Sequence, residues 1–286
     1  MPLTARSPSR QLVDLVGALG GTWHGLVAMC RCPAHADRTP SLSLRQGDIG
    51  ILVTCFAGCE REDVLRELAR VPISGPFPMP PTMPPPSTAN VERLWEQAGS
   101  ADAPLAQTYL GGRGFVRTPP DIRYHPRCPH GPRHHTVFKP AVLVAVREAR
   151  KLVALQRIFL DADTGRYTAK ATLGRPGRGA WRGRAAGAVL ALAEGFETAE
   201  AFAILNGVPC WATLGARRLD QVDIPAGVNE LLIAEDNDAE GRRAALGACD
   251  HYAHSGLVVR RDPPPRHCKD WAQALELQMK RGGGVG

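Results

Sequence analysis

The sequence predicts an α/β protein assembled from several parts, and three features of its 286 residues lead to this prediction. Cys and His residues crowd into the first sixty positions, although the chain has only eight Cys in all. The stretch PISGPFPMPPTMPPPSTAN, at 72–90, is so rich in proline that an extended linker is expected there. From residue 188 onward, short apolar runs alternate with helical segments, which is the pattern of a parallel sheet with helical connections.

The N-terminal Cys and His residues have the spacing of metal ligands. Two tight pairs occur, Cys32-Pro-Ala-His35 and Cys55-Phe-Ala-Gly-Cys59. Three thiolates and one imidazole complete the tetrahedral ligand set of a structural Zn²⁺ site. The strand-forming runs SLSLR and GILVTC lie between the pairs, so a hairpin can join them in a small zinc-ribbon-like domain that the ion helps to fold. Cys30 is an alternative ligand in place of Cys32, and scattered core thiols are the other interpretation.

Composition and patterning divide the chain into four regions. We expect a zinc-binding domain at 1–71, the linker at 72–90, a mixed α+β subdomain at 91–186 and a Rossmann-like parallel-sheet subdomain at 187–286. The expected helices cover 11–20, 62–70 and 91–110. The second subdomain should contain a turn at 111–114, a loop with short strands at 118–140, a hairpin of 141–146 with 152–160, and a third strand at 167–169.

Acidic residues stand at the ends of two strands in the last region. The run VLALA ends at Glu194, and the run ELLIA is followed shortly by Asp236 and Asp238. Because the carboxyl ends of parallel strands open on one crevice, we expect these three carboxylates to converge. Neighbouring carboxylates repel one another unless cations lie between them, and an all-oxygen site suits Mg²⁺ or Mn²⁺. Taken alone, each motif also fits an ordinary strand end or a helix cap.

Two stretches resemble DNA primases. CPAHADRTPSLSL with CFAGC resembles the zinc-binding domain of bacterial, phage and plasmid primases, which helps to read the template; the three residues inside CFAGC depart from the commoner two. The order strand-Glu-Gly, helix, strand, strand-Asp-x-Asp-x-x-Gly, helix resembles the Toprim pattern from about Gly187 to Trp271. The resemblance implies that this C-terminal region is a Toprim catalytic subdomain.

The same resemblance implies roles for the acidic residues. Glu194 would be a catalytic carboxylate acting in acid–base chemistry, and Asp236 and Asp238 would hold magnesium. Glu197, in the segment EGFET, is expected near the metals. Asp270, in a Lys-Asp-Trp segment similar to one that closes this domain in phage and plasmid primases, is a further candidate, with a helix N-cap as the alternative.

Basic residues provide candidate contacts to nucleic acid and nucleotide. A formal charge of +7 suits a polyanionic partner, although a generally Arg-rich composition explains it equally well. Five cations lie in one glycine-broken segment that suits a phosphate-tracking groove or, alternatively, a solvated loop: Lys170, Arg175, Arg178, Arg182 and Arg184. YLGGRG and LQRIFLD resemble upstream segments of mobile-element primases, which implies Arg113 and Arg157 as phosphate contacts. The irregularly spaced His and Cys residues at 125–135 offer ligands for a second metal, but the intervening prolines favour an ordinary polar loop.

The expected function is synthesis of short RNA primers on single-stranded DNA by two-metal transfer from nucleoside triphosphates, in a phage, plasmid or other mobile element. A non-catalytic zinc-finger and Toprim accessory protein of replication is the alternative. The four Tyr residues have no gate domain of a topoisomerase to serve, and the lack of a Walker A motif argues against an ATPase-coupled nuclease. That lack also predicts a separate replicative helicase as a partner. With no apolar run of about 18 residues, we expect a cytoplasmic protein without membrane contact.

Overall fold

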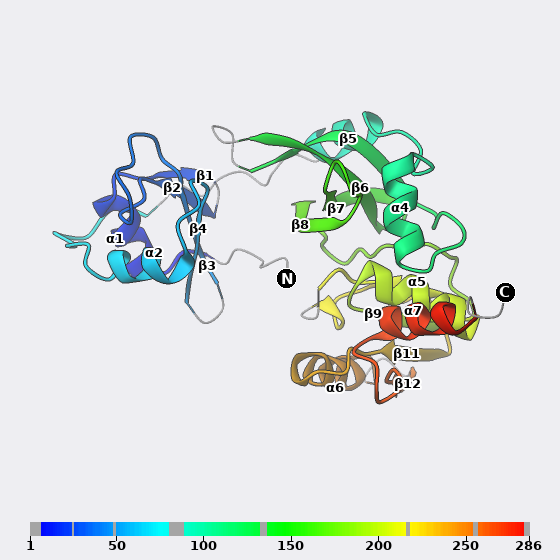
Figure 1. Cartoon of the computed structure of the whole chain (residues 1–286). Helices are drawn as coiled ribbons and strands as arrows, with labels where there is room; N and C mark the ends of the chain where they lie inside the picture. Colours follow the sequence, from blue (N-terminus) through cyan, green and yellow to red (C-terminus); the bar gives the residue numbers. More distant parts are fainter. Residues whose placement is uncertain are drawn as a thin grey trace. The chain divides into compact units, whose positions relative to one another are not determined.

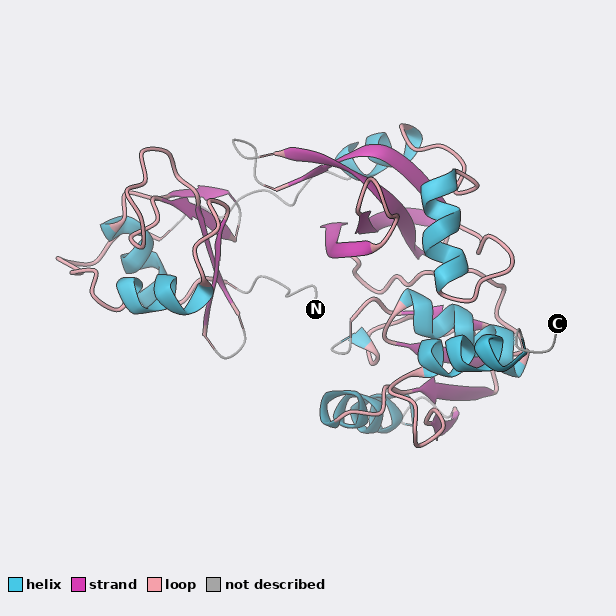
Figure 2. Ribbon diagram, viewed as in Figure 1, coloured by secondary structure: helices cyan, strands magenta, loops and turns pink. Residues whose placement is uncertain are grey.

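The computed structural model describes residues 7–24, 26–47, 50–79, 89–131, 136–215, 218–253 and 257–282 (Figure 1). The chain separates into two compact units. The N-terminal unit includes the described residues up to 79, and the C-terminal unit includes those of 89–130 and 137–282. Both units mix helices with strands (Figure 2), and the α/β class predicted from the sequence is confirmed.

A four-stranded antiparallel sheet forms the N-terminal unit. Its strands follow the chain in the order β1 (Thr22–His24), β2 (Val27–Cys30), β3 (Leu42–Gln46) and β4 (Ile51–Cys55). Two helices, α1 (Arg10–Ala18) and α2 (Arg61–Leu68), supply further core residues. Alternation along β3 buries Leu42 and Leu44, which join Leu12 and Val16 of α1 and Val64 of α2 in one hydrophobic cluster.

The start of the predicted linker packs against α1. Phe77 lies so close to Gly17 that a Cβ there would come within 2.1 Å of the Phe ring. The backbone N–H of Phe77 also donates to Asp14 at 2.9 Å. These contacts hold the chain on the N-terminal unit to at least this point. Residues 80–88 of the predicted linker lie outside the described residues.

The C-terminal unit begins with two helices and an antiparallel sheet. The helices are α3 (Ala89–Glu96) and α4 (Pro104–Gly112). The strands run in the order β5 (Ile122–His130), β6 (Val137–Glu148), β7 (Lys151–Leu160) and β8 (Tyr167–Gly174). One face of this sheet packs on α3 and the other belongs to the main core of the unit.

Two expectations for this region are wrong. A single helix was expected at 91–110, but Pro104 has no N–H to continue a helix and instead begins α4. A loop with short strands was expected at 118–140, but β5 is a nine-residue strand. Its prolines, Pro126 and Pro129, are tolerated because β5 is an edge strand with an irregularity between His125 and Cys128.

A second, parallel sheet completes the C-terminal unit. Its strands, in spatial order, are β10 (Cys210–Ala212), β9 (Val189–Ala193), β11 (Glu230–Ala234) and β12 (Val258–Asp262). The helices α5 (Phe196–Asn206) and α7 (Trp271–Gly282) pack together, and α6 (Ala239–Ala253) contacts β11 and β12 (Figure 1). The apolar side chains fall into two clusters, one with α5 and α7 and one with α6. This is the α/β sheet that the sequence predicts.

Trp181 joins the two sheets of the C-terminal unit. Its backbone exchanges hydrogen bonds with Ala212 of β10 at 2.9 and 3.1 Å. Its ring is fully buried, meets Phe196 edge to face at 4.9 Å, and donates to the carbonyl of Pro120 at 3.0 Å. Trp181 thereby fixes α5 relative to the segment that leads into β5. No helix within the described ranges is long and apolar enough to cross a membrane.

Replacing Trp181 by Ala should destabilise the C-terminal unit. The change removes a fully buried indole and leaves a cavity, which costs about 3–5 kcal/mol of unfolding free energy. Urea unfolding followed by circular dichroism measures this loss. Val116→Ala is the control, because Val116 is 82% exposed, and it should change stability by about 0.5 kcal/mol or less. Equal stability of the two variants would contradict the role of Trp181 at this seam.

Candidate functional site

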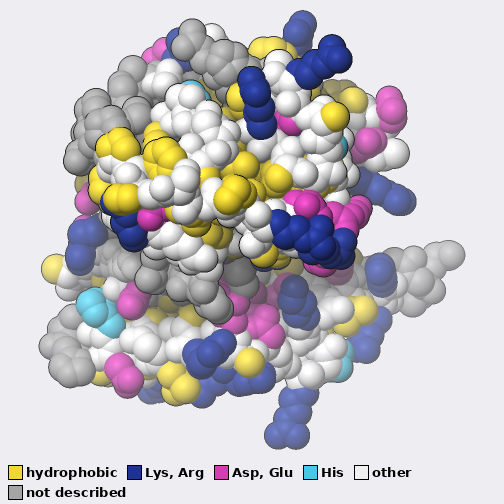
Figure 3. All heavy atoms as spheres, turned by 90° about the vertical axis from the view of Figure 1, so that its left-hand side faces the viewer, with side chains coloured by type: hydrophobic (Ala, Val, Ile, Leu, Met, Phe, Trp, Pro, Cys, Tyr) yellow, Lys and Arg dark blue, Asp and Glu magenta, His cyan; other side chains and the backbone are white. Residues whose placement is uncertain are grey.

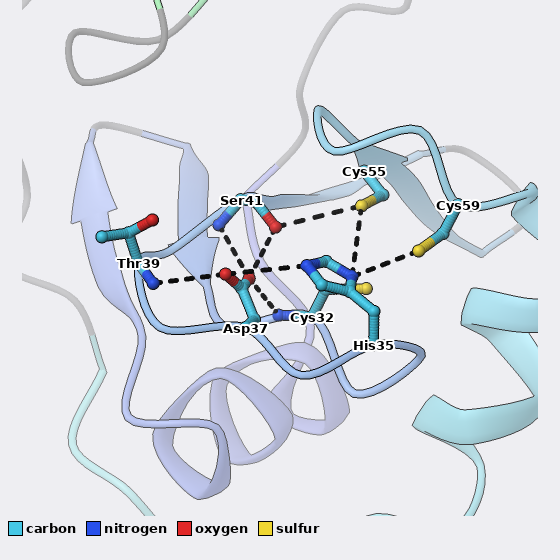
Figure 4. Close-up of polar contacts among 7 residues, drawn as sticks. All are labelled: Cys32, His35, Asp37, Thr39, Ser41, Cys55 and Cys59. Atoms are coloured by element: carbon cyan, nitrogen blue, oxygen red, sulfur yellow. Dashed lines mark hydrogen bonds and ion pairs between the residues drawn. The ribbon is translucent and has the colours of Figure 1, made fainter.

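The N-terminal Cys and His residues form a compact cluster. The ligand atoms of Cys32, His35, Cys55 and Cys59 all lie within 4.8 Å of one another (Figure 4). His35 Nδ1 is 3.2 Å from Cys59 Sγ and 4.0 Å from Cys55 Sγ. Among the residues that the structure describes, no other such group of Cys, His, Asp and Glu side chains is drawn together this closely. Three thiols and an imidazole at this separation fit a tetrahedral zinc ion.

Asp37 organises the loop that carries the first pair of ligands. Its carboxylate accepts hydrogen bonds from the backbone N–H of Cys32 at 2.8 Å and from the Ser41 hydroxyl at 2.5 Å. It also lies 3.7 Å from Nε2 of His35, so it can orient the imidazole whose Nδ1 faces the thiols (Figure 4). Cys30 lies outside the cluster and is fully buried in the hydrophobic core. The geometry therefore groups Cys32, and not Cys30, with the other three.

The acidic residues meet at the carboxyl end of the parallel sheet, beside β9, where the strand order reverses. Strand β9 pairs with β10 on one side and β11 on the other, and Ala193 lies opposite Ala234 in register. The residues that follow these positions leave the sheet at the same edge, at the switch point where α/β proteins commonly bind ligands. Glu194, Asp236 and Asp238 all line one cleft there, with a volume of about 550 Å³. The structure thus brings the three predicted carboxylates together.

The same cleft contains further charged residues. Of the other candidates from the sequence, Glu197, Asp270, Arg113 and Lys170 line it. Charged residues that the sequence interpretation did not assign to the site also line it: Glu240, Lys269 and Glu276. The cleft is therefore acidic around the strand ends and carries three cations.

Asp236 is the carboxylate of the cleft whose negative charge is least favourable. Burial, followed by the charges of Glu194, Asp270 and Asp238, raises the pKa of Asp236 to about 7. Its Oδ1 is buried and has no hydrogen-bond partner among the described residues. A buried, unpaired carboxylate oxygen beside other carboxylates is what a divalent cation would neutralise. The residues present therefore fit Mg²⁺ or Mn²⁺.

Local backbone contacts hold this acidic edge in place. Asp238 accepts a hydrogen bond from the N–H of Gly241 at 2.8 Å and so caps α6. A Cβ on Gly241 would lie 2.4 Å from the carbonyl oxygen of Asp236, which explains the glycine of the Asp-x-Asp-x-x-Gly pattern. Asn237 binds the carbonyl of Lys269 through its backbone N–H at 2.6 Å. That contact places the Lys-Asp-Trp segment beside the cleft.

Asp270 is both a helix cap and a residue of the cleft, which the sequence left as alternatives. Its carboxylate accepts a hydrogen bond from the N–H of Gln273 at 2.8 Å, which caps the first turn of α7. It also lines the cleft, and its charge contributes to the raised pKa of Asp236. A role of Asp270 in metal binding stays a prediction.

The predicted cations separate into two groups. Arg113 and Lys170 line the cleft, whereas most of the others have partners elsewhere. Arg178 pairs with Asp223, Arg184 with Glu200 at 2.5 and 2.8 Å, and Arg182 stacks over Trp211 at 4.4 Å from the ring centroid. Arg175 is exposed. Figure 3 presents the left-hand side of Figure 1, where Lys and Arg side chains of the chain as a whole are dispersed among acidic and hydrophobic ones. Within the segment 170–184, Lys170 alone lines the cleft, and a phosphate-binding groove formed by the four arginines stays a prediction.

Arg157 lies on the opposite face of its sheet from the cleft. It shares a face of β7 with Leu155 and Phe159, which pack towards α3, while Ile158 faces the main core. Its guanidinium donates to the carbonyl of Pro129 at 2.8 Å and stacks 5.4 Å from the Phe159 ring centroid. A phosphate contact by Arg157 stays a prediction, and it would have to form away from the acidic residues.

Tyr109 is a cleft neighbour that sequence reasoning missed. It is buried on α4, one helical turn before Arg113, whose guanidinium lies 5.6 Å from the Tyr ring centroid. Its hydroxyl donates to Glu197. The only signal in the sequence was the four-residue spacing within YLGGRG, which does not reveal that α4 packs beside α5.

Comparison with protein families identifies the C-terminal fold. Residues 189–280 match the family described as the Toprim domain. This part of the chain is a Toprim domain. Residues 86–183, which precede it, match a family described as a domain of unknown function (DUF7146). No curated protein matches the chain.

Solved structures that resemble the chain include several primases. A DNA primase domain from Pseudomonas aeruginosa is 17% identical, with a TM-score of 0.47, over 68% of this chain and 76% of that one. The zinc-binding and RNA polymerase domains of the Aquifex aeolicus primase are 15% identical, with a TM-score of 0.47, over 95% and 83%. The primase fragment of the bacteriophage T7 primase-helicase protein is 13% identical, with a TM-score of 0.43, over 91% and 97%.

Zinc content tests the N-terminal cluster. The full chain should contain about one zinc ion, and Cys59→Ser should lose it and loosen the N-terminal unit, because the ion supplies folding energy to so small a core. Metal content by mass spectrometry and proteolysis within 7–79 measure both effects. Cys30→Ala is the matched control, and it should keep its zinc. Loss of zinc from Cys30→Ala alone would reverse the assignment of Cys32 and Cys30.

The raised pKa of Asp236 predicts how stability depends on pH. A carboxyl whose pKa is higher in the folded chain favours folding at low pH, and this advantage is lost as the pH rises from about 4 to about 7. Without divalent cations, Asp236→Asn should therefore be more stable than the natural chain at pH 8, by about 2 kcal/mol. The difference should shrink towards pH 4, and Mn²⁺ should stabilise only the natural chain. Urea unfolding at the two pH values measures this difference. Equal stability of the two proteins at pH 8 would show that the charge of Asp236 does not destabilise the folded chain.

Proposed function

We propose that this protein is a DNA primase that makes short RNA primers on single-stranded DNA. The observation that carries the proposal is the cleft of the Toprim domain, where Glu194, Asp236 and Asp238 face the cations Arg113 and Lys170. Nucleotidyl transfer needs this combination, because a triphosphate must be held next to carboxylates that bind divalent cations. The Cys-His cluster and its resemblance to primase zinc-binding domains support the same function.

Each group in the cleft has a role in the proposed reaction. Asp236 and Asp238 would hold Mg²⁺ or Mn²⁺ together with Glu194, and the ions would supply charge neutralisation at the reacting phosphate. Glu194, at the end of β9, would accept the proton of the attacking 3′-hydroxyl. The new bond joins that oxygen to the α-phosphate, and pyrophosphate leaves. Arg113 and Lys170 would bind the triphosphate, and Asp270 would complete the acidic edge.

The N-terminal unit and the remaining cations would bind nucleic acid. In this proposal the zinc-binding domain binds the single-stranded template. The exposed Arg175, together with Arg157 on the far face of the antiparallel sheet, would contact the template's phosphates. A replicative helicase would be a separate partner protein, and the likeness of the motifs to phage and plasmid primases suggests a mobile element. The alternative, a Toprim accessory protein without activity, keeps the DNA binding but not the metal-dependent chemistry.

Primer synthesis tests the proposed function directly. Incubation with single-stranded DNA of varied sequence, labelled ribonucleotides and Mg²⁺ or Mn²⁺ should give short RNA products. Asp236→Ala should lower the rate by about 100-fold or more, because it removes a ligand of the ions that stabilise the transition state. Asp163→Ala, in an exposed turn of the antiparallel sheet, is the matched control and should keep the activity. If the natural chain binds single-stranded DNA but makes no primer even with a helicase added, the accessory role is the correct one.

A further inference from the structure

Glu197 is held by two donors from outside the Toprim domain. Lys170, on β8, reaches its carboxylate at 2.7 and 2.8 Å, and the hydroxyl of Tyr109, on α4, donates to the same group. Glu197 is 6% exposed, so water does not compete effectively for these contacts. With a partly exposed ammonium and a buried phenol as partners, the Glu197 carboxylate is already neutralised and hydrogen-bonded.

The electrostatics of this pair differ from those of Asp236. Burial alone would raise the pKa of Glu197, but the charge of Lys170 and the hydrogen bonds from Lys170 and Tyr109 outweigh it, and the pKa is lowered. Asp236, by contrast, has a raised pKa and a buried oxygen without a partner among the described residues. Of the two, Asp236 is the one that still requires a cation.

The contact decides where the Lys170 ammonium lies. Neighbours of Lys170 on β8, Ala169 and Ala171, pack towards α3, so alternation turns Lys170 to the face that meets α5. A Lys side chain is long and flexible, and an ion pair to a buried carboxylate fixes its end at the wall of the cleft. Arg113 reaches the same wall from α4, next to Tyr109.

We propose that Glu197 is a positioning residue that fixes the Lys170 ammonium for contact with a nucleoside triphosphate, and that it is not a ligand of the divalent cations. This inference rests on the proposed function in one respect, namely that the cleft binds a triphosphate. It groups Glu197 with Arg113 and Lys170, the cations that line the cleft from outside the Toprim domain, whereas the sequence interpretation expected Glu197 near the metals. Tyr109 shares this role, because its hydroxyl fixes the same carboxylate from the other side.

Two binding measurements on the full, zinc-loaded chain test the assignment. Calorimetric titration with Mn²⁺ alone tests for a ligand role, and titration with ATP at saturating Mn²⁺ tests for the positioning role. Glu197→Gln should keep the Mn²⁺ affinity within about twofold but weaken ATP binding about tenfold, the size of one lost charge-assisted contact. Lys170→Met should do the same, and the double variant should lose no more than Lys170→Met alone, because the two changes remove one interaction.

Glu200→Gln is the matched control. Glu200 lies on the same helix, is 3% exposed and is paired with Arg184, but it does not line the cleft. The two Gln variants should unfold at similar temperatures, and only Glu197→Gln should lose ATP affinity. A loss caused by damage to α5 would appear in both variants.

Three outcomes would overturn the inference. Loss of Mn²⁺ affinity in Glu197→Gln, as expected for Asp236→Ala, would make Glu197 a metal ligand. Unchanged ATP affinity in Glu197→Gln would remove its positioning role. A natural chain that does not bind ATP would show that the cleft is not a triphosphate site. A natural chain that binds ATP as expected but makes no primer contradicts the proposed function alone, and the assignment of Glu197 stands.

Discussion

Repulsion among carboxylates at one edge of the parallel sheet is the constraint on which the rest of the C-terminal unit depends. Strands β9 and β11 end side by side, so Glu194 and Asp236 leave the sheet into the same crevice, and burial makes the charge of Asp236 costly. The fold keeps them there through α6, whose Gly241 approaches the backbone of Asp236 more closely than any side chain would allow. A divalent cation between the carboxylates would relieve this repulsion, and below about pH 7 a proton on Asp236 would do the same.

The antiparallel sheet supplies the opposite charge, which makes the two sheets one functional unit. Lys170 comes from β8 and Arg113 from the end of α4, and both line the cleft of the Toprim domain. Their positions depend on the seam at Trp181, where the backbone of the connecting segment pairs with β10. The Toprim domain alone would therefore keep its carboxylates and Lys269 but lose Arg113 and Lys170 from the cleft.

Sequence reasoning found what depends on local pattern and missed what depends on packing. Ligand spacing identified the four Cys and His residues. The alternation of strands with helices placed Glu194, Asp236 and Asp238 at the ends of parallel strands and so identified them as neighbours. It did not find Tyr109, because the contact of its hydroxyl with Glu197 joins residues far apart in the chain. For the same reason, the sequence did not reveal that Arg178 and Arg184 pair with Asp223 and Glu200, carboxylates that only the fold brings near.

The positive charge of the chain is consequently a poor guide to where a polyanion would bind. Many of the cations that contribute to this charge form ion pairs with carboxylates, such as Arg147 with Asp121 and Arg261 with Glu235, each at 2.7 Å. Neither Arg147 nor Arg261 lines the cleft, so a triphosphate bound there would not meet these pairs. Lys170 differs in that it and its partner Glu197 both line the cleft, so the ion pair fixes the ammonium at the site where the acidic residues lie. Location, and not the net charge of +7, is what makes this cation suited to a triphosphate.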